Sequence, residues 1–172
     1  ADGYNVAVGA EAGALMTTGV QNTFIGGLAG DATDDGTNNV AVGFEALSAN
    51  CGSGNTSVGT RAGKATTADN NTFVGNNAGT ATTTGANNTA LGFSSLSANI
   101  LGTLNTAIGR SALASDTKGN NSVAVGYNTL NAQNFTSATD VYNTAVGYAA
   151  GAAVTTGIQN TFIGGLAGDA NT

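Results

Sequence analysis

One short motif recurs from end to end of the 172-residue chain: an asparagine, three residues that favour extended backbone, and a glycine. Asn22-Thr23-Phe24-Ile25-Gly26 is one copy, and in one other copy Ser122 replaces the asparagine. The glycines that end the ten copies are Gly9, Gly26, Gly43, Gly59, Gly75, Gly92, Gly109, Gly126, Gly147 and Gly164. They lie 16 or 17 residues apart, except for one interval of 21 residues. This near-constant period predicts a repeat protein in which each copy forms one coil of a stack.

The residues of each copy predict the fold class. β-Branched Thr, Val and Ile before the glycine favour a short strand, and the frequent Gly and Asn exclude helices. We therefore expect an all-β protein, a parallel β-solenoid of about ten coils of 16–17 residues, with residues 1–172 as a single array. A second short strand is expected after each glycine, at pairs such as Ala29-Gly30 and Ala112-Leu113. Where this pair ends in Leu, the leucine is expected to fill the interior; where it ends in Gly, a neighbouring layer must fill it.

Two features interrupt the simple period. The coil between Gly126 and Gly147 has extra residues, which predict a loop at 131–142 that bulges from the stack. In addition, the segment from Thr18 to Ala32 returns almost unchanged from Thr156 to Ala170, 138 residues later. This super-repeat of eight coils indicates that the chain is a window on a longer repetitive array.

Alternation along the strand predicts which side chains face inward. We expect the aliphatic residue before each coil glycine to form the core: Val8, Ile25, Val42, Val58, Val74, Leu91, Ile108, Val125, Val146 and Ile163. The residue before it is then expected to face outward and form an interface: Ala7, Phe24, Ala41, Phe73, Ala90, Ala107, Ala124, Ala145 and Phe162. Because an exposed apolar column usually marks an interface, this pattern predicts a homo-oligomer.

Composition excludes several classes of function. The chain has four Lys and Arg residues and a net charge of −6, so it lacks the basic surface that nucleic acid requires. It has no histidine, which rules out a Ser-His-Asp or Cys-His arrangement, and we expect neither enzyme activity nor a cofactor. Cys51 is the single cysteine and is interpreted as a bystander thiol. No apolar run approaches membrane-spanning length, so this segment is not expected to insert into a membrane.

Two groups of side chains remain as candidate sites. Asp31, Asp34 and Asp35 could offer oxygen ligands to Ca²⁺, although a solvated acidic turn is the preferred interpretation. Aromatic residues gather around the long coil: Tyr127, Phe135, Tyr142 and Tyr148. Such a cluster can stack on sugars or anchor a protein partner, and it can equally cap an irregular turn.

The copy Asn121-Ser122-Val123-Ala124-Val125-Gly126 resembles the head repeats of trimeric autotransporter adhesins (YadA-like heads), and the other nine coils follow the same pattern loosely. The coils are also similar to repeats in phage tail fibres and in long bacterial surface proteins. The resemblance covers essentially the whole chain. It implies a left-handed parallel β-roll, three chains packed around an axis, and a location outside the cell or on its surface. The usual head repeat is shorter, and here the additional residues enlarge the linker.

Together these observations favour a non-enzymatic extracellular structural or adhesive fibre that assembles with itself and displays polar loops to a surface receptor or glycan. A phage tail-fibre shaft is a variant of this hypothesis. An ice-binding solenoid is the alternative, because one strand position forms a column of threonines: Thr23, Thr56, Thr72, Thr89, Thr106, Thr144 and Thr161. Ice binding requires regular outward rows, and this column is expected to share its face with the predicted aliphatic core.

Overall fold

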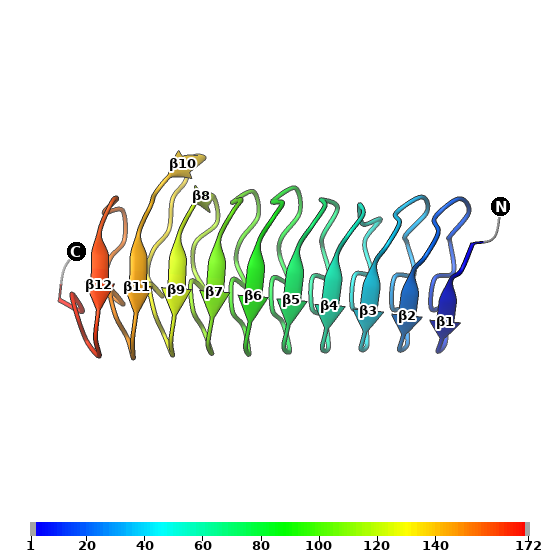
Figure 1. Cartoon of the computed structure of the whole chain (residues 1–172), viewed down its shortest axis with the longest axis horizontal. Helices are drawn as coiled ribbons and strands as arrows, with labels where there is room; N and C mark the ends of the chain where they lie inside the picture. Colours follow the sequence, from blue (N-terminus) through cyan, green and yellow to red (C-terminus); the bar gives the residue numbers. More distant parts are fainter. Residues whose placement is uncertain (1–2, 171–172) are drawn as a thin grey trace.

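The computed structural model describes residues 3–170 and shows a rod of stacked coils (Figure 1). Each coil contributes one three-residue strand to a ten-stranded sheet, so the rod has nine full turns. These strands are β1 (Val6–Val8), β2 (Thr23–Ile25), β3 (Val40–Val42), β4 (Thr56–Val58), β5 (Thr72–Val74), β6 (Thr89–Leu91), β7 (Thr106–Ile108), β9 (Val123–Val125), β11 (Thr144–Val146) and β12 (Thr161–Ile163). No helix occurs among the described residues.

Every neighbouring pair in this sheet is parallel and in the same register. Thr56 lies beside Thr72, and Val58 lies beside Val74; the equivalent pairs repeat along the rod. Each motif position therefore forms a straight column parallel to the rod axis. The predicted all-β parallel β-solenoid is confirmed.

The chain turns sharply after each strand, and the expected second strand is absent from the described coils. The second residue after each coil glycine has a positive φ, as in Glu45 (54°) and Arg61 (58°), and so does the fourth, as in Leu47 (48°) and Gly79 (58°). Two left-handed residues separated by one other cannot form an extended strand. Hydrogen bonds between coils nevertheless continue through the turn, for example from Gly30 N–H to the Ala46 carbonyl at 2.9 Å.

The coil glycine itself is required by close approach of the backbone. Gly26 has a φ of 134°, and a Cβ there would lie 2.5 Å from the carbonyl oxygen of Gly43 in the next coil. The other coil glycines from Gly9 to Gly147 repeat this contact with the next coil glycine. A side chain at these positions would therefore force neighbouring coils apart.

The long coil protrudes from one side of the rod, as predicted for residues 131–142 (Figure 1). Its residues Thr139–Asp140 form β10, which pairs in parallel with β8 (Gly119–Asn120) in a separate two-stranded sheet. Tyr142 follows β10 and leads back to the main sheet at β11. The inserted residues are thus anchored on the preceding coil.

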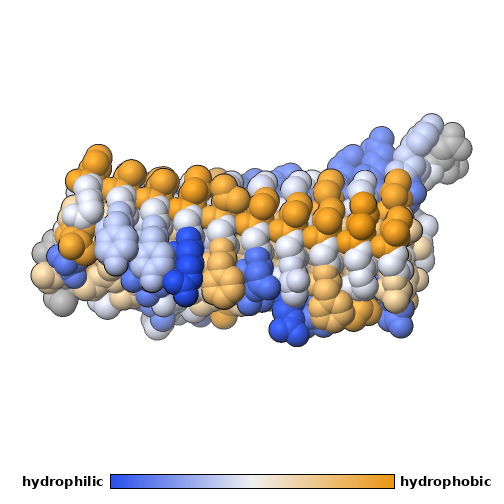
Figure 2. All heavy atoms as spheres, turned by 90° about the horizontal axis from the view of Figure 1, so that it is seen from below, coloured by the Kyte–Doolittle hydropathy of each residue, from blue (hydrophilic) through white to orange (hydrophobic). Residues whose placement is uncertain are grey.

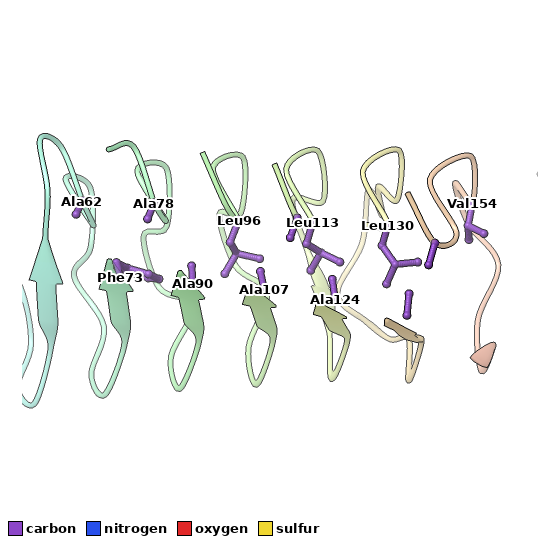
Figure 3. Packing of buried hydrophobic residues seen from close by; sticks show 13 residues of the cluster. Ala62, Phe73, Ala78, Ala90, Leu96, Ala107, Leu113, Ala124, Leu130 and Val154 are labelled. Carbon is purple, nitrogen blue, oxygen red and sulfur yellow. The ribbon is translucent and has the colours of Figure 1, made fainter. Parts of the chain in front are cut away.

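The interior of the rod is lined by the middle residue of each strand, which we call the inner column. Its members are Ala7, Phe24, Ala41, Ser57, Phe73, Ala90, Ala107, Ala124, Ala145 and Phe162. From Phe24 to Ala145 every member is fully buried, and Phe162 is partly buried against the same core. Turn residues Leu96, Leu113 and Leu130 point into the same interior (Figure 3), and Leu47 is fully buried in the cluster that contains Phe24.

This finding corrects the predicted faces of the strand. Except for Ala7, which is exposed in the first coil, the residues expected to form an interface line the core, and those expected to form the core lie on the outside. Val8, Ile25, Val58, Leu91, Val146 and Ile163 are exposed, whereas Val42, Val74, Ile108 and Val125 are half-buried. The physical reason is that the narrow interior accommodates alanine or a few well-spaced phenylalanines, but not an aliphatic branch from every coil.

Phenylalanine from the strand fills this interior in some coils, and leucine from the turn fills it in others. Phe24, Phe73 and Phe162 each lie against two glycines, one in the same coil and one in the preceding coil. For Phe73 these are Gly79 and Gly63, where a Cβ would lie 2.5 Å and 2.7 Å from the ring. The coils of Ala41, Ala90, Ala107 and Ala124 instead supply a leucine from the turn. The expectation that a neighbouring layer fills the glycine copies is therefore confirmed for Gly13, Gly63 and Gly151, whereas Gly30, Gly79 and Gly168 are filled from their own coil.

The motif asparagines form a buried ladder on the same side of the strand as the inner column. The Oδ1 of Asn88 accepts the backbone N–H of Asn105 at 3.0 Å, and its Nδ2 donates to the carbonyl of Gly102 at 2.9 Å. Equivalent bonds link Asn5, Asn22, Asn39, Asn55, Asn71, Asn88, Asn105 and Ser122 in sequence, and Asn143 with Asn160. The buried backbone N–H groups of the motif residues from Asn22 to Ser122, and that of Asn160, are satisfied in this way.

The ladder is interrupted where Ser122 replaces asparagine, and the long coil repairs it. Gln133 Nε2 donates to Ser122 Oγ at 3.0 Å and also to Asp116 Oδ2, while its Oε1 accepts from Asn143 Nδ2 at 2.8 Å. All four side chains are buried. The substitution at Ser122 and the inserted segment that begins near Gln133 are therefore one structural feature.

Candidate interaction surfaces

The outer face of the ten-stranded sheet is the largest regular surface of the rod. It carries two columns, the aliphatic residues from Val8 to Ile163 that precede the coil glycines, and the residues two positions earlier in each coil. This earlier column holds Val6, Thr23, Val40, Thr56, Thr72, Thr89, Thr106, Val123, Thr144 and Thr161. Its members and the aliphatic residues are all exposed or half-buried. Figure 2 shows the apolar band that runs along the length of the rod.

No charged residue occupies either column of this outer face. The chain contains 14 charged residues, all of them at other positions. Nine spacings of about 4.8 Å give the face a length of about 43 Å. A contiguous apolar surface of this kind is typical of an interface.

The threonine column predicted from the sequence lies on this outer face. Thr23, Thr56, Thr89, Thr106 and Thr144 are half-buried, whereas Thr72 and Thr161 are exposed. The threonines share this face with the Val, Ile and Leu column, as expected. The face is the outside of the rod, so the expectation that it forms the core is wrong.

A third column borders the outer face and consists of the residue that follows each coil glycine. We call it the edge ladder; it contains Ala10, Gly27, Phe44, Thr60, Asn76, Phe93, Arg110, Tyr127, Tyr148 and Gly165. The guanidinium carbon of Arg110 lies 5.7 Å from the ring centroid of Phe93 and 5.5 Å from that of Tyr127. The rings of Tyr127 and Tyr148 stack with centroids 5.4 Å apart and an interplanar angle of 11°. Figure 2 shows this edge beside the apolar band.

The four aromatic residues singled out from the sequence separate into different environments. Tyr127 and Tyr148 belong to the edge ladder and are 41% and 60% exposed. Phe135 is buried beneath the long coil, and its carbonyl accepts from Thr117 Oγ1 at 2.9 Å. Tyr142 is exposed at the end of that coil. Sequence reasoning did not find Phe93 and Arg110; their shared position after the coil glycine was the signal that could have placed them beside Tyr127.

The structure does not assemble the proposed calcium ligands. Within residues 3–170 no group of three acidic, histidine or cysteine side chains is positioned to hold a metal ion. Asp34 instead accepts the hydroxyl of Thr17, and its carbonyl accepts the N–H groups of Thr17, Thr18 and Gly19. Burial raises the pKa of Asp31, with the carboxylates of Glu11 and Glu45 adding to the effect. Asp34 is therefore hydrogen-bonded to the preceding coil, and the three residues form part of a turn between coils.

Two further ionisable side chains, Glu45 and Cys51, have pKa values shifted by their surroundings. Glu45 Oε2 accepts from Lys64 Nζ at 2.9 Å and from Arg61 Nε at 2.8 Å, and these bonds lower the pKa of Glu45. Cys51 is buried with its Sγ 3.2 Å from Thr33 Oγ1, and burial raises the pKa of the thiol. Neither group lies in the edge ladder or on the outer face.

Comparison with protein-family models, with curated proteins and with solved structures found no match to this chain. A search of residues 3–170 for helices that could cross a membrane also found none.

Proposed function

We propose that this chain is part of a non-enzymatic extracellular structural or adhesive fibre, in which copies of the chain assemble through the outer face. The observation that carries the proposal is the uninterrupted outward column of Val, Ile and Leu beside a column of Thr and Val. Ten coils in register keep this surface continuous. Burying it against protein removes apolar surface from water, which contributes about 25 cal/mol per Å².

A second copy of the same chain is the partner that fits this face. The two columns have a constant spacing, so a second array with the same spacing can contact every coil. Neither column carries charge, so two chains with a net charge of −6 approach there without a close pair of like charges. The resemblance to adhesin head repeats adds a specific expectation, which is a trimer of left-handed rolls.

The mass of the assembly in solution tests this proposal. We expect light scattering to give three times the mass of one chain, and electron micrographs of the same sample to show thin rods. Val58→Asp combined with Val74→Asp places carboxylates at the centre of the outer face and is expected to yield monomers. Thr84→Asp adds a carboxylate at an exposed linker position and is the matched control.

Circular dichroism of each variant establishes that the coil fold is retained. A monomeric wild-type chain at all concentrations would overturn the assembly, and so would an assembled Val58→Asp, Val74→Asp variant. The extracellular location requires a separate experiment: antibodies against the chain are expected to label the surface of intact producing cells, or purified virions if the fibre belongs to a phage. Labelling only after lysis would contradict that location.

Ice binding is the second candidate, and a specific observation favours it. The threonine column faces outward on an in-register parallel sheet, with about 4.8 Å between threonines of adjacent coils. Valine interrupts the column at Val6, Val40 and Val123. If this face binds ice, the monomer should show thermal hysteresis that Thr89→Tyr abolishes. Thermal hysteresis near zero would exclude this candidate.

A further inference from the structure

Four consecutive coils place planar side chains next to one another in the edge ladder: Phe93, Arg110, Tyr127 and Tyr148. They are exposed rather than buried; the exposed fraction is 49% for Phe93, 41% for Tyr127 and 60% for Tyr148. Their mutual stacking limits side-chain motion. Binding of a ligand therefore costs less side-chain conformational entropy than it would on four separate side chains.

Arg110 makes this stack chemically specific. Of the other three basic side chains, Arg61 and Lys64 pair with Glu45, and Lys118 Nζ donates to the Thr136 carbonyl. Within residues 3–170, Arg110 has no carboxylate partner and donates only to the Tyr127 hydroxyl, at 3.3 Å. A guanidinium has five N–H donors in its plane, and stacking against rings leaves that plane's edge available. Such an edge binds a carboxylate or sulfate with two parallel hydrogen bonds.

The end of the stack provides an uncovered aromatic surface. The next residue of the edge ladder after Tyr148 is Gly165, which has no side chain to cover the ring. A ring-shaped ligand can therefore lie against Tyr148 in the space above Gly165. The backbone at Gly165 is outside the left-handed region, so a side chain can be introduced there without backbone strain.

We propose that the edge ladder from Phe93 to Gly165 binds an acidic saccharide: one sugar ring stacks on Tyr148, and a carboxylate or sulfate of the same saccharide binds Arg110. Arg110 and Tyr148 are two coil spacings, about 10 Å, apart, and a ring over Gly165 lies about one spacing further, which requires about three sugar rings. Ser94, Ser111 and Asn128 follow the ladder residues directly and are half-buried, so they place hydroxyl and amide groups beside the site. This inference rests on the proposed adhesive role and names the chemistry of its ligand.

A saccharide fits this surface better than the other polymers. Nucleic acid carries a phosphate at every nucleotide and requires several basic side chains along its path, whereas Arg110 is the one basic residue of the edge ladder. An extended peptide would add to a free strand edge, but every strand from β2 to β11 in the main sheet is paired on both sides.

Binding is measured by calorimetry and ligand-observed NMR at about 0.15 M ionic strength, where charge interactions over long distances are screened. The probes are galacturonic acid trisaccharide, its uncharged methyl ester, and a sulfated galactan tetrasaccharide, which separates the carboxylate source from the sulfate source. We expect at least one acidic probe to bind. The methyl ester should bind at least about tenfold more weakly, since it lacks the charge-assisted bonds. Arg110→Gln should weaken binding by a similar factor.

Two variants make the test independent of general charge effects. Gly165→Leu fills the space beside Tyr148 and is expected to weaken binding of the acidic probe, whereas Arg61→Gln removes a positive charge outside the ladder and should leave binding unchanged. Failure of both acidic probes to bind at millimolar concentration would overturn the inference, as would equal binding of the methyl ester or equal effects of Arg110→Gln and Arg61→Gln. The mass of each sample is measured in parallel. An assembled chain that fails to bind refutes only the saccharide site, whereas a monomer that binds refutes only the assembly.

Discussion

The ring of Phe73 occupies the space that a side chain at Gly79 would require, since a Cβ at Gly79 would lie 2.5 Å from the ring. The next coil uses the opposite solution, with Ala90 on the strand and Leu96 in the turn, both fully buried. The interior thus takes its volume either from the strand or from the turn, and the two positions are coupled.

This coupling predicts a compensating pair of substitutions. Phe73→Ala should lower the free energy of unfolding by about 3–5 kcal/mol through the cavity it leaves. Gly79→Leu should cost about 3 kcal/mol or more, because the new side chain overlaps the ring and has a positive φ. The double variant reproduces the arrangement of Ala90 and Leu96, so we expect it to be at least about 2 kcal/mol more stable than the sum of the two changes. Urea unfolding followed by circular dichroism measures all three, and additive effects would contradict the coupling.

The asparagine ladder predicts a second large effect on stability. Asn88→Ala leaves the N–H of Asn105 without its partner, while the Gly102 carbonyl keeps the hydrogen bond from Asn99 Nδ2. An unsatisfied buried group costs about 1–3 kcal/mol, so the expected loss is about 1–3 kcal/mol. Asn76→Ala, at an exposed position of the edge ladder, is the matched control and should change stability by less than about 0.5 kcal/mol. Equal effects of the two substitutions in urea unfolding would show that the ladder contributes little.

Cys51 is predicted to be unreactive in the folded rod. The thiol is buried and its pKa is raised by burial, so the reactive thiolate is scarce and inaccessible at neutral pH. We expect a thiol reagent such as DTNB to modify Cys51 at least about a hundredfold more slowly in buffer than in denaturant, because reaction requires the coil to open. Rapid modification without any change in circular dichroism would contradict the buried position.

Glu45 predicts a defined dependence of stability on pH. Hydrogen bonds from Lys64 and then Arg61 lower the pKa of this carboxyl in the folded chain. A lowered pKa means that the contribution to stability is present above the ordinary glutamate value of about 4.3 and disappears as pH falls through the lower folded value. The difference in Tm between wild type and Glu45→Gln should therefore be constant from about pH 6 to 8 and vanish in acid. Thermal unfolding at a series of pH values measures it, and a difference that grows in acid would refute the assignment.

The repeat was readable from the sequence because its signals are local. A glycine at a fixed position after three strand-forming residues predicted the strands, the stacking and the long loop, and each is present in the structure. The turn after the glycine was predicted incorrectly. Residues such as Glu45, Arg61 and Leu47 have left-handed backbone there without being glycine, so their type gives no indication of it.

The candidate surfaces were predicted less well. Tyr127 and Tyr148 were recognised as a possible binding cluster, but Phe93 and Arg110 lie two coils and one coil before Tyr127 and join it only through stacking. For Asp31, Asp34 and Asp35 an acidic turn was preferred to a calcium site, and in the structure Asp34 accepts a hydrogen bond from Thr17 of the preceding coil.

The sequence by itself determined the fold class, the number of coils and the alignment of equivalent positions, because these follow from the period of the motif. Only the tertiary structure decided which face of each strand is the interior. Alternation assigns two sets of residues to opposite faces, and here both sets are apolar, so hydrophobicity alone cannot choose between them. The choice follows from space: the interior must hold the asparagine ladder and one side chain per strand, and Phe73 fits there only because Gly63 and Gly79 leave room for its ring.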